Sequence, residues 1–169
     1  NVKRGLVDSE YNLRREQCET VAKYFGATAL RDVTLAQLNS AKEQLEPVLF
    51  KRACHVISEN ERAVATLKAL KANDMALISV AMRASHISLR DDFEVTTKEM
   101  DGLVEMIDEV LGDKGGVRMT GGGFGGCVVA LVPNNLVMQV NDVVNNKYES
   151  QFGLKPSIYL CTATQGAFR

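Results

Sequence analysis

The spacing of apolar residues predicts helices over the first two thirds of the chain. Apolar positions recur at helical spacing from Ser9 to Phe25, and Gly26 is placed to end this helix. The same reasoning predicts further helices over residues 34–44, 47–71 and 97–111, and one that begins after Asn73 or Asp74.

Two of these helices carry a polar residue on an otherwise apolar stripe. In the helix over 47–71, Asn60 lies on the expected core-facing stripe, which consists of Leu49, Ala53, Val56, Asn60, Ala63, Leu67 and Leu70. We expect Asn60 to bond to backbone or to another buried polar group. In the next helix, His86 lies among Ile78, Met82 and Leu89. A capping box of Thr96 and Glu99 is expected to open the helix over 97–111, which Gly112 ends.

The period of the pattern changes after residue 112. Residues 117–119 and 127–132 are typical of two strands separated by a run of glycines, and 156–161 of a third. Asn134 or Asn135 is expected to cap a helix that ends at Gly153, and residues 2–7 resemble another short strand. Helices followed by strand, strand, helix and strand predict an α+β fold, in which the helices pack on a small, mainly antiparallel sheet.

Composition and charge narrow the class of protein. The chain has 169 residues, of which 46% are hydrophobic and 24% charged, as is ordinary for one globular domain. A formal net charge of −1 argues against a general electrostatic attraction to nucleic acid or to an anionic membrane. No membrane-spanning stretch and no signal peptide stand out. The cysteines are widely spaced among apolar neighbours, so we expect buried free thiols in a reducing cytoplasm for Cys18, Cys54, Cys127 and Cys161.

Glycines gather in one place. Eight of the 13 glycines lie within residues 112–126, and the densest run is Thr120, Gly121, Gly122, Gly123, Phe124, Gly125 and Gly126. Such a loop adopts positive φ and brings backbone N–H groups close to a phosphate or carboxylate. It lacks the Lys-Ser or Lys-Thr of a Walker A loop, and a strand follows it where a dinucleotide-binding loop has a helix. A hairpin turn needs only two or three glycines, so we favour an anion-facing loop that Phe124 anchors by packing.

The other polar candidates indicate structure more than chemistry. His55 and His86 lie on different predicted helices without a partner at metal-ligand spacing, and we expect both to be structural. The adjacent Asp91 and Asp92 at a helix end are expected to be solvated. Tyr11, at the start of a helix, is expected to pack in the core. The residues supply no set of nucleophile, base and orienting group, so by themselves they indicate an α+β domain with an anion-ready loop.

Four segments in order along the chain match one family. They are residues 9–18 (SEYNLRREQC), 30–34 (LRDVT), 85–95 (SHISLRDDFEV) and 118–127 (RMTGGGFGGC). The last resembles the third signature of galactokinases, in the superfamily of sugar, homoserine, mevalonate and phosphomevalonate kinases. The glycine-rich run is common to that superfamily, and the other three segments narrow the resemblance to galactokinases of bacterial type.

The resemblance implies the C-terminal portion of a galactokinase, a little under half of the enzyme. The family's galactose-binding signature and its glycine- and serine-rich ATP loop do not occur in these residues, which agrees with a first residue, Asn1, in strand-like sequence. Residues 1–45 are expected to join from the N-terminal half and to carry part of the sugar site. Residues 46–169 are expected to form the C-terminal kinase domain, a ferredoxin-like α+β layer.

The resemblance also implies a reaction and residue roles. The full enzyme transfers the γ-phosphate of ATP to the C1 hydroxyl of α-D-galactose, with Mg²⁺, in the cytoplasm. Tyr11 matches the tyrosine that hydrogen-bonds a hydroxyl of galactose, and Gly121–Gly126 match the loop that faces the active-site cleft. The family's catalytic base, assisting arginine and magnesium ligand lie outside this chain. We therefore expect no catalytic or metal-binding residue here and no activity of the chain alone.

Three other interpretations stay open at the level of sequence. A kinase for N-acetylgalactosamine shares most of these segments, and a non-catalytic regulator that responds to sugar and ATP shares them as well. The sequence upstream of residue 1 decides between these and a galactokinase. A small ligand-sensing module is the third, and calorimetry with galactose and ATP tests it. The roles of His86, Asp91 and Asp92, the sugar selectivity and the oligomeric state are not given by the sequence.

Overall fold

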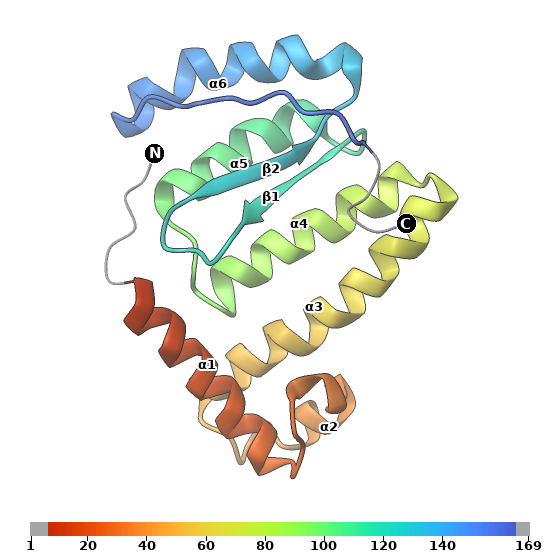
Figure 1. Cartoon of the computed structure of the whole chain (residues 1–169), viewed down its shortest axis with the longest axis vertical. Coiled ribbons are helices and arrows are strands. Elements are labelled where there is room, and N and C mark those ends of the chain that lie inside the picture. The colour runs from red at the N-terminus through yellow and green to blue at the C-terminus, as the bar shows by residue number, and fades with distance from the viewer. Residues whose placement is uncertain (1–6, 165–169) are drawn as a thin grey trace.

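The structure is a computed structural model that describes residues 7–164, with side chains described from residue 10 onward. This part of the chain contains helices, two short 3₁₀ turns and a hairpin (Figure 1). The helices are α1 (Val7–Tyr24), α2 (Leu35–Ser40), α3 (Pro47–Ala72), α4 (Met75–Asp91), α5 (Lys98–Leu111) and α6 (Val137–Phe152). The strands are β1 (Gly116–Thr120) and β2 (Cys127–Leu131), and the turns are Leu30–Asp32 and Asn134–Leu136. The strand expected over 2–7 lies outside the described residues except for Val7, which begins α1.

Local capping signals set most of the helix starts. Thr34 caps α2 and Asp74 caps α4, each with a side-chain oxygen that accepts a backbone N–H of the first turn. The capping box predicted for α5 is wrong. Its cap is Thr97, one residue later than Thr96, and the Thr97 hydroxyl accepts the N–H of Met100. The glycines predicted to end α5 and α6 do so, both at positive φ.

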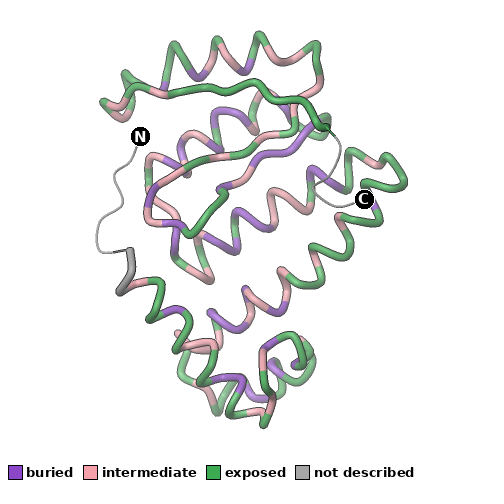
Figure 2. The backbone as a smooth tube through the Cα atoms, viewed as in Figure 1, coloured by how far each residue is buried: buried purple, intermediate pink, exposed green. Residues whose placement is uncertain are grey.

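Three apolar clusters hold the elements together (Figure 2). The first joins α1 and α2 to the first half of α3 around Val21. The second lies between α5, β1 and α6 around Leu111. The third is small and joins the end of α4 to α5 and β1, through Leu89, Val95, Met100 and Met119. The glycine-rich loop packs against this third cluster.

The small sheet is an antiparallel hairpin, with Gly116 opposite Leu131 and Thr120 opposite Cys127. The expected α+β class with a small antiparallel sheet is confirmed. The strand expected over 156–161 is wrong: this segment runs past α6 in Figure 1, but the sheet of the described residues contains only β1 and β2. A strand needs a neighbour for its N–H and C=O groups, and this segment has none in the sheet.

Part of the expected core of α3 lies at the surface. Its buried residues are Arg52, Ala53, His55, Ile57 and Ala69. Asn60 is exposed, as are Leu67 and Leu70, so the predicted stripe fails in the second half of the helix. Figure 2 shows that most residues in that half of α3 are exposed.

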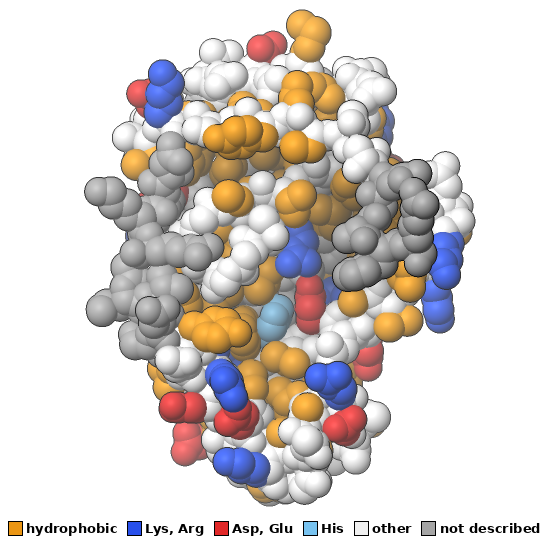
Figure 3. All heavy atoms as spheres, in the orientation of Figure 1, with side chains coloured by type: hydrophobic (Ala, Val, Ile, Leu, Met, Phe, Trp, Pro, Cys, Tyr) orange, Lys and Arg blue, Asp and Glu red, His pale blue; other side chains and the backbone are white. Residues whose placement is uncertain are grey.

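The thiols are also less buried than predicted. Cys18 and Cys54 are half-buried, Cys127 and Cys161 are exposed, and all four are free. Cys127 lies on the face of β2 that also exposes Val129 and Leu131, because no layer of the described chain covers that face. Figure 3 shows hydrophobic side chains at the surface in several patches.

Candidate functional site

The glycine run forms the loop between β1 and β2, at the end of the hairpin that faces α1 (Figure 1). Four of its glycines have φ between +84° and +118°, namely Gly121, Gly123, Gly125 and Gly126. These values lie in the region that glycine adopts without strain, so the backbone path itself requires the cluster. Phe124 also has a positive φ, of +57°.

The tip of this loop is bonded to the segment that follows α4. The N–H of Phe124 donates to the carbonyl oxygen of Val95 at 2.6 Å. Gly123 lies so close that a Cβ placed on it would be 2.4 Å from the same oxygen. The ring of Phe124 packs against the third apolar cluster, which confirms that it anchors the loop. Because this N–H points inward, an anion would meet the outer residues Gly121 and Gly122, which are exposed.

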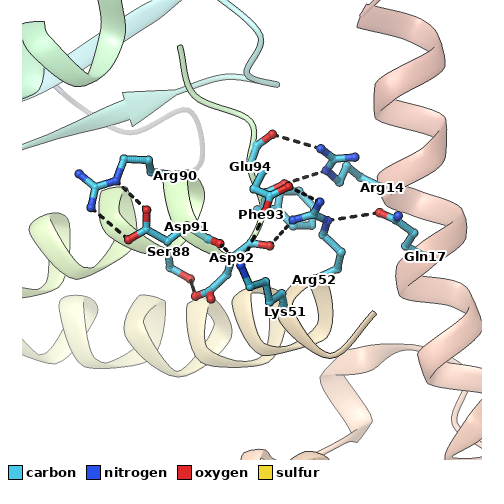
Figure 4. A network of polar contacts seen from close by, with 10 residues as sticks. All are labelled: Arg14, Gln17, Lys51, Arg52, Ser88, Arg90, Asp91, Asp92, Phe93 and Glu94. Atoms are coloured by element: carbon cyan, nitrogen blue, oxygen red, sulfur yellow. Dashed lines mark hydrogen bonds and ion pairs between the residues drawn. The ribbon is translucent and has the colours of Figure 1, made fainter. Parts of the chain in front are cut away.

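Two cations of α3 hold the C-terminal end of α4 (Figure 4). Lys51 Nζ donates to the carbonyl of Asp91 at 3.3 Å, and Arg52 Nη1 donates to the carbonyl of Asp92. Arg52 Nη2 also donates to Glu94 Oε2 at 2.7 Å, and this bond lowers the pKa of Glu94. Carbonyls at a helix C-terminus have no partner within the helix and carry partial negative charge, so these cations stabilise this end of α4.

Arg14 of α1 holds the next two carbonyls from the other side (Figure 4). Its Nε donates to the carbonyl of Phe93 at 2.7 Å and its Nη2 to that of Glu94 at 3.1 Å. Its guanidinium carbon lies 5.6 Å from the centre of the Phe124 ring, within the range of a cation–π contact. The carbonyls of residues 91–94 thus all accept from cations, and that of Val95 accepts from the loop.

Sequence reasoning missed the buried arginines Arg14 and Arg52. The signal that finds Arg14 is its place four and seven residues before Cys18 and Val21, on the inner face of α1. Arg52 lies beside the buried Ala53, but no spacing rule marks it as inward.

His55 of α3 contacts the end of α4 and the residues that follow it. Its Nδ1 lies 3.0 Å from Ser88 Oγ, and the Ser88 hydroxyl donates to Asp92 Oδ2 at 2.8 Å. Because that hydroxyl has one proton, we assign Nδ1 of His55 as the donor to Ser88. The ring stacks on Phe93 with centroids 4.6 Å apart, and burial lowers the pKa of His55 to about 4. His55 is therefore structural, as predicted, whereas Asp92 is half-buried and bonded instead of solvated.

Buried polar groups also fix β1, the strand that enters the loop. The N–H of Met119 donates to His86 Nδ1 at 3.3 Å. His86 Nε2 lies 3.3 Å from Asp101 Oδ1, outside hydrogen-bond geometry, and burial lowers the pKa of His86. Arg118 Nη1 lies 3.2 Å from Glu59 Oε1. Two successive residues of β1 are thus tied to helices, and the place of His86 is structural.

Tyr11 lies on α1, one helical turn before Arg14. It is 58% exposed, so the expectation that it packs in the core is wrong. It precedes Arg14 by three residues on α1, which puts both side chains on one side of the helix. Arg14 contacts Phe124, so Tyr11 lies within one helical turn of a contact to the glycine-rich loop. Asp91 is exposed and paired with Arg90, as expected for a helix end.

Comparison with known proteins adds two findings. Residues 66–149 match the family model of the GHMP kinases C-terminal domain. The fold is similar to that of Lactococcus lactis galactokinase, crystallised in complex with galactose, with a TM-score of 0.87 and 33% identity over 94% of this chain. The chain spans 42% of the length of that galactokinase. Within residues 7–164, no helix has both the length and the apolar character to cross a membrane.

Proposed function

This chain carries the C-terminal domain of the GHMP kinases, and from that premise we propose that it is the C-terminal part of a galactokinase. The longer protein then transfers the γ-phosphoryl group of ATP to the C1 hydroxyl of α-D-galactose. The observation that supports this most strongly is the likeness to Lactococcus lactis galactokinase at 33% identity over 94% of the chain. Because the chain spans 42% of that relative, the activity is assigned to the longer protein.

Two features of this chain are proposed to contact the substrates. Tyr11 donates a hydrogen bond from its phenol to a galactose hydroxyl, which its exposure permits. The loop Gly121–Gly126 faces the cleft and supports the ATP phosphates and the sugar pocket. Phosphoryl transfer depends mostly on positioning and on stabilising charge. A loop that is tied down by Val95 and packed by Phe124 suits that demand.

The division of labour along the chain is part of the proposal. Residues 1–45 contribute to the sugar site and 46–169 form the C-terminal kinase domain. The first apolar cluster crosses this boundary, from Leu30 to Ala53, so the boundary separates roles and not independently folding units. ATP and Mg²⁺ are proposed to be held mainly by the longer protein. Within residues 10–164, no three histidine, cysteine or carboxylate side chains gather as a metal site.

A substrate panel tests the proposed function. ADP release by the purified full-length protein is measured with ATP, Mg²⁺ and, in turn, galactose, N-acetylgalactosamine, homoserine and mevalonate. We expect galactose to give the highest kcat/KM. A higher kcat/KM with N-acetylgalactosamine would replace galactose as the substrate. Binding of galactose and ATP by calorimetry without any ADP release would instead identify a non-catalytic regulator.

A further inference from the structure

Arg14 connects the two features of the chain that are proposed to meet the substrates. It lies on α1 three residues after Tyr11, and its guanidinium carbon lies 5.6 Å from the centre of the Phe124 ring. Its Nε and Nη2 donate to the carbonyls of the two residues before Val95. Val95 in turn accepts the N–H of Phe124 at 2.6 Å. One side chain thus reaches the loop by two routes, one direct and one through the turn after α4.

The surroundings of Arg14 indicate which of its contacts matter. The side chain is buried, with Glu10 Oε2 3.4 Å from its Nη1. Burial and the nearby Arg52 both lower the pKa of Arg14. An apolar side chain would fill this space without bringing a second cation close to Arg52. What it would not supply is the pair of hydrogen bonds to the carbonyls of residues 93 and 94 and the cation over the ring.

We propose that Arg14 is a positioning residue that couples the sugar-contact end of α1 to the glycine-rich loop, so that both keep one relative placement. The sugar role of Tyr11 rests on the function proposed above, whereas the mechanical link between α1 and the loop does not. Lysine does not substitute for Arg14 in this role. The planar guanidinium donates in two fixed directions while its face covers a ring, and a single ammonium on a flexible stem cannot.

Hydrogen exchange followed by mass spectrometry tests the link without any substrate. In the full-length protein, Arg14→Lys and Arg14→Met are compared with Arg15→Lys. Arg15 is the matched control, because it is the next residue on α1, is 70% exposed in its side chain and pairs with Glu19 at 2.8 Å. The Arg14 variants are expected to exchange amides of residues 120–127 about 10-fold faster, the equivalent of one lost charge-assisted hydrogen bond.

The part of the protein in which exchange becomes faster distinguishes a positioning role of Arg14 from general destabilisation. Peptides from α6, which packs on α5, are expected to exchange at the wild-type rate in the Arg14 variants. Unchanged exchange in 120–127, or equal acceleration in 120–127 and α6, would overturn the proposal. If Arg14→Met does not fold, Arg14→Lys, which keeps the charge and most of the side-chain volume, carries the comparison with Arg15→Lys. Exchange in 120–127 at the wild-type rate in Arg14→Lys would equally overturn the link.

Addition of galactose tests the coupling. In the wild type, saturating galactose is expected to slow exchange in 120–127, and in Arg14→Lys this protection is expected to disappear while the galactose Kd changes less than threefold. Protection that persists in Arg14→Lys would refute the coupling. If the wild type does not bind galactose by calorimetry, the proposed function fails, and the substrate-free comparison still decides the role of Arg14.

Discussion

Alanine substitution at two neighbouring glycines tests how the loop is held. Gly123 has a φ of +84°, and a Cβ there would lie 2.4 Å from the carbonyl oxygen and 2.6 Å from the Cβ of Val95. Gly122, the residue before it, is exposed, lies outside the left-handed region and has open space where a Cβ would be. The two glycines are adjacent in the chain, and they differ in backbone conformation, in exposure and in the space around them.

The expected loss for Gly123→Ala has two parts. A non-glycine residue at this φ costs about 1–2 kcal/mol. The carbonyl of Val95 must also move, which weakens its hydrogen bond from Phe124 by about 1 kcal/mol. Together these give a loss of about 2–3 kcal/mol in the free energy of unfolding for Gly123→Ala, whereas Gly122→Ala is expected to stay within about 0.5 kcal/mol of wild type.

Urea unfolding of the chain, followed by circular dichroism, measures both values. The midpoint should fall for Gly123→Ala and hold for Gly122→Ala, with the slope unchanged in each. Equal stabilities of the two variants would refute the inference that the loop is pressed against Val95. In the full-length protein, the same change at Gly123 should raise the KM for ATP more than the change at Gly122 does.

Three further variants and one control test the segment after α4 and the sugar contact. Since burial lowers the pKa of His55 from 6.5 to about 4, the unfolded chain takes up a proton first as the pH falls. The contribution of neutral His55 to the free energy of unfolding is thus complete above pH 6.5. About 3 kcal/mol of this contribution is lost on acidification to pH 4. His55→Gln should flatten this part of the pH dependence in urea titrations, and an unchanged slope would contradict it. Arg52→Met, which leaves the carbonyl of Asp92 unpaired, should lower the free energy of unfolding by about 3 kcal/mol, whereas Arg31→Met, at an exposed site, should change it by less than about 0.5 kcal/mol. Equal losses would contradict the role of Arg52 in holding the end of α4. In the full-length protein, Tyr11→Phe should reduce kcat/KM for galactose by about 1 kcal/mol with little change for ATP, and unaltered kinetics for galactose would remove Tyr11 from the site.

Features set by local chemistry could be predicted from the sequence. Pro47 begins α3 because its missing N–H is tolerated in the first turn of a helix. Gly112 and Gly153 end α5 and α6 because each adopts a positive φ. The hairpin around the glycine run follows from the change of period and from the backbone freedom of glycine. None of these depends on which element lies alongside.

Features that depend on a neighbour could not be predicted. α3 has 26 residues, and its first half packs on α1, on α2 and on the end of α4. In its second half Leu67 and Leu70 are exposed, so the buried face changes along the helix. A periodic stripe assumes one continuous neighbour, and Asn60 is exposed for that reason. The segment 156–161 has the composition of a strand but no partner in the sheet.

In the candidate site, too, some features could be predicted from the sequence and others could not. Resemblance and glycine content identified the loop and Tyr11 as candidates, and in the structure Arg14, one turn after Tyr11 on α1, contacts the loop at Phe124. The bonds from Arg14 and Arg52 to the segment after α4 could not be predicted, because hydrophobicity patterns place arginine side chains on the solvent-exposed face of a helix. A guanidinium is buried when backbone carbonyls pair with its donors, and those carbonyls belong to residues 92–94 of another element.

We propose that this chain is part of an enzyme that phosphorylates galactose at C1. Phosphorus NMR of the products tests it most directly, with the full-length protein and the 169-residue chain each incubated with ATP, Mg²⁺ and galactose. We predict the signal of α-galactose 1-phosphate, in equal amount to ADP, from the full-length protein and none from the chain alone. A phosphate at another hydroxyl, no sugar phosphate from the full-length protein, or turnover by the chain alone would contradict this proposal.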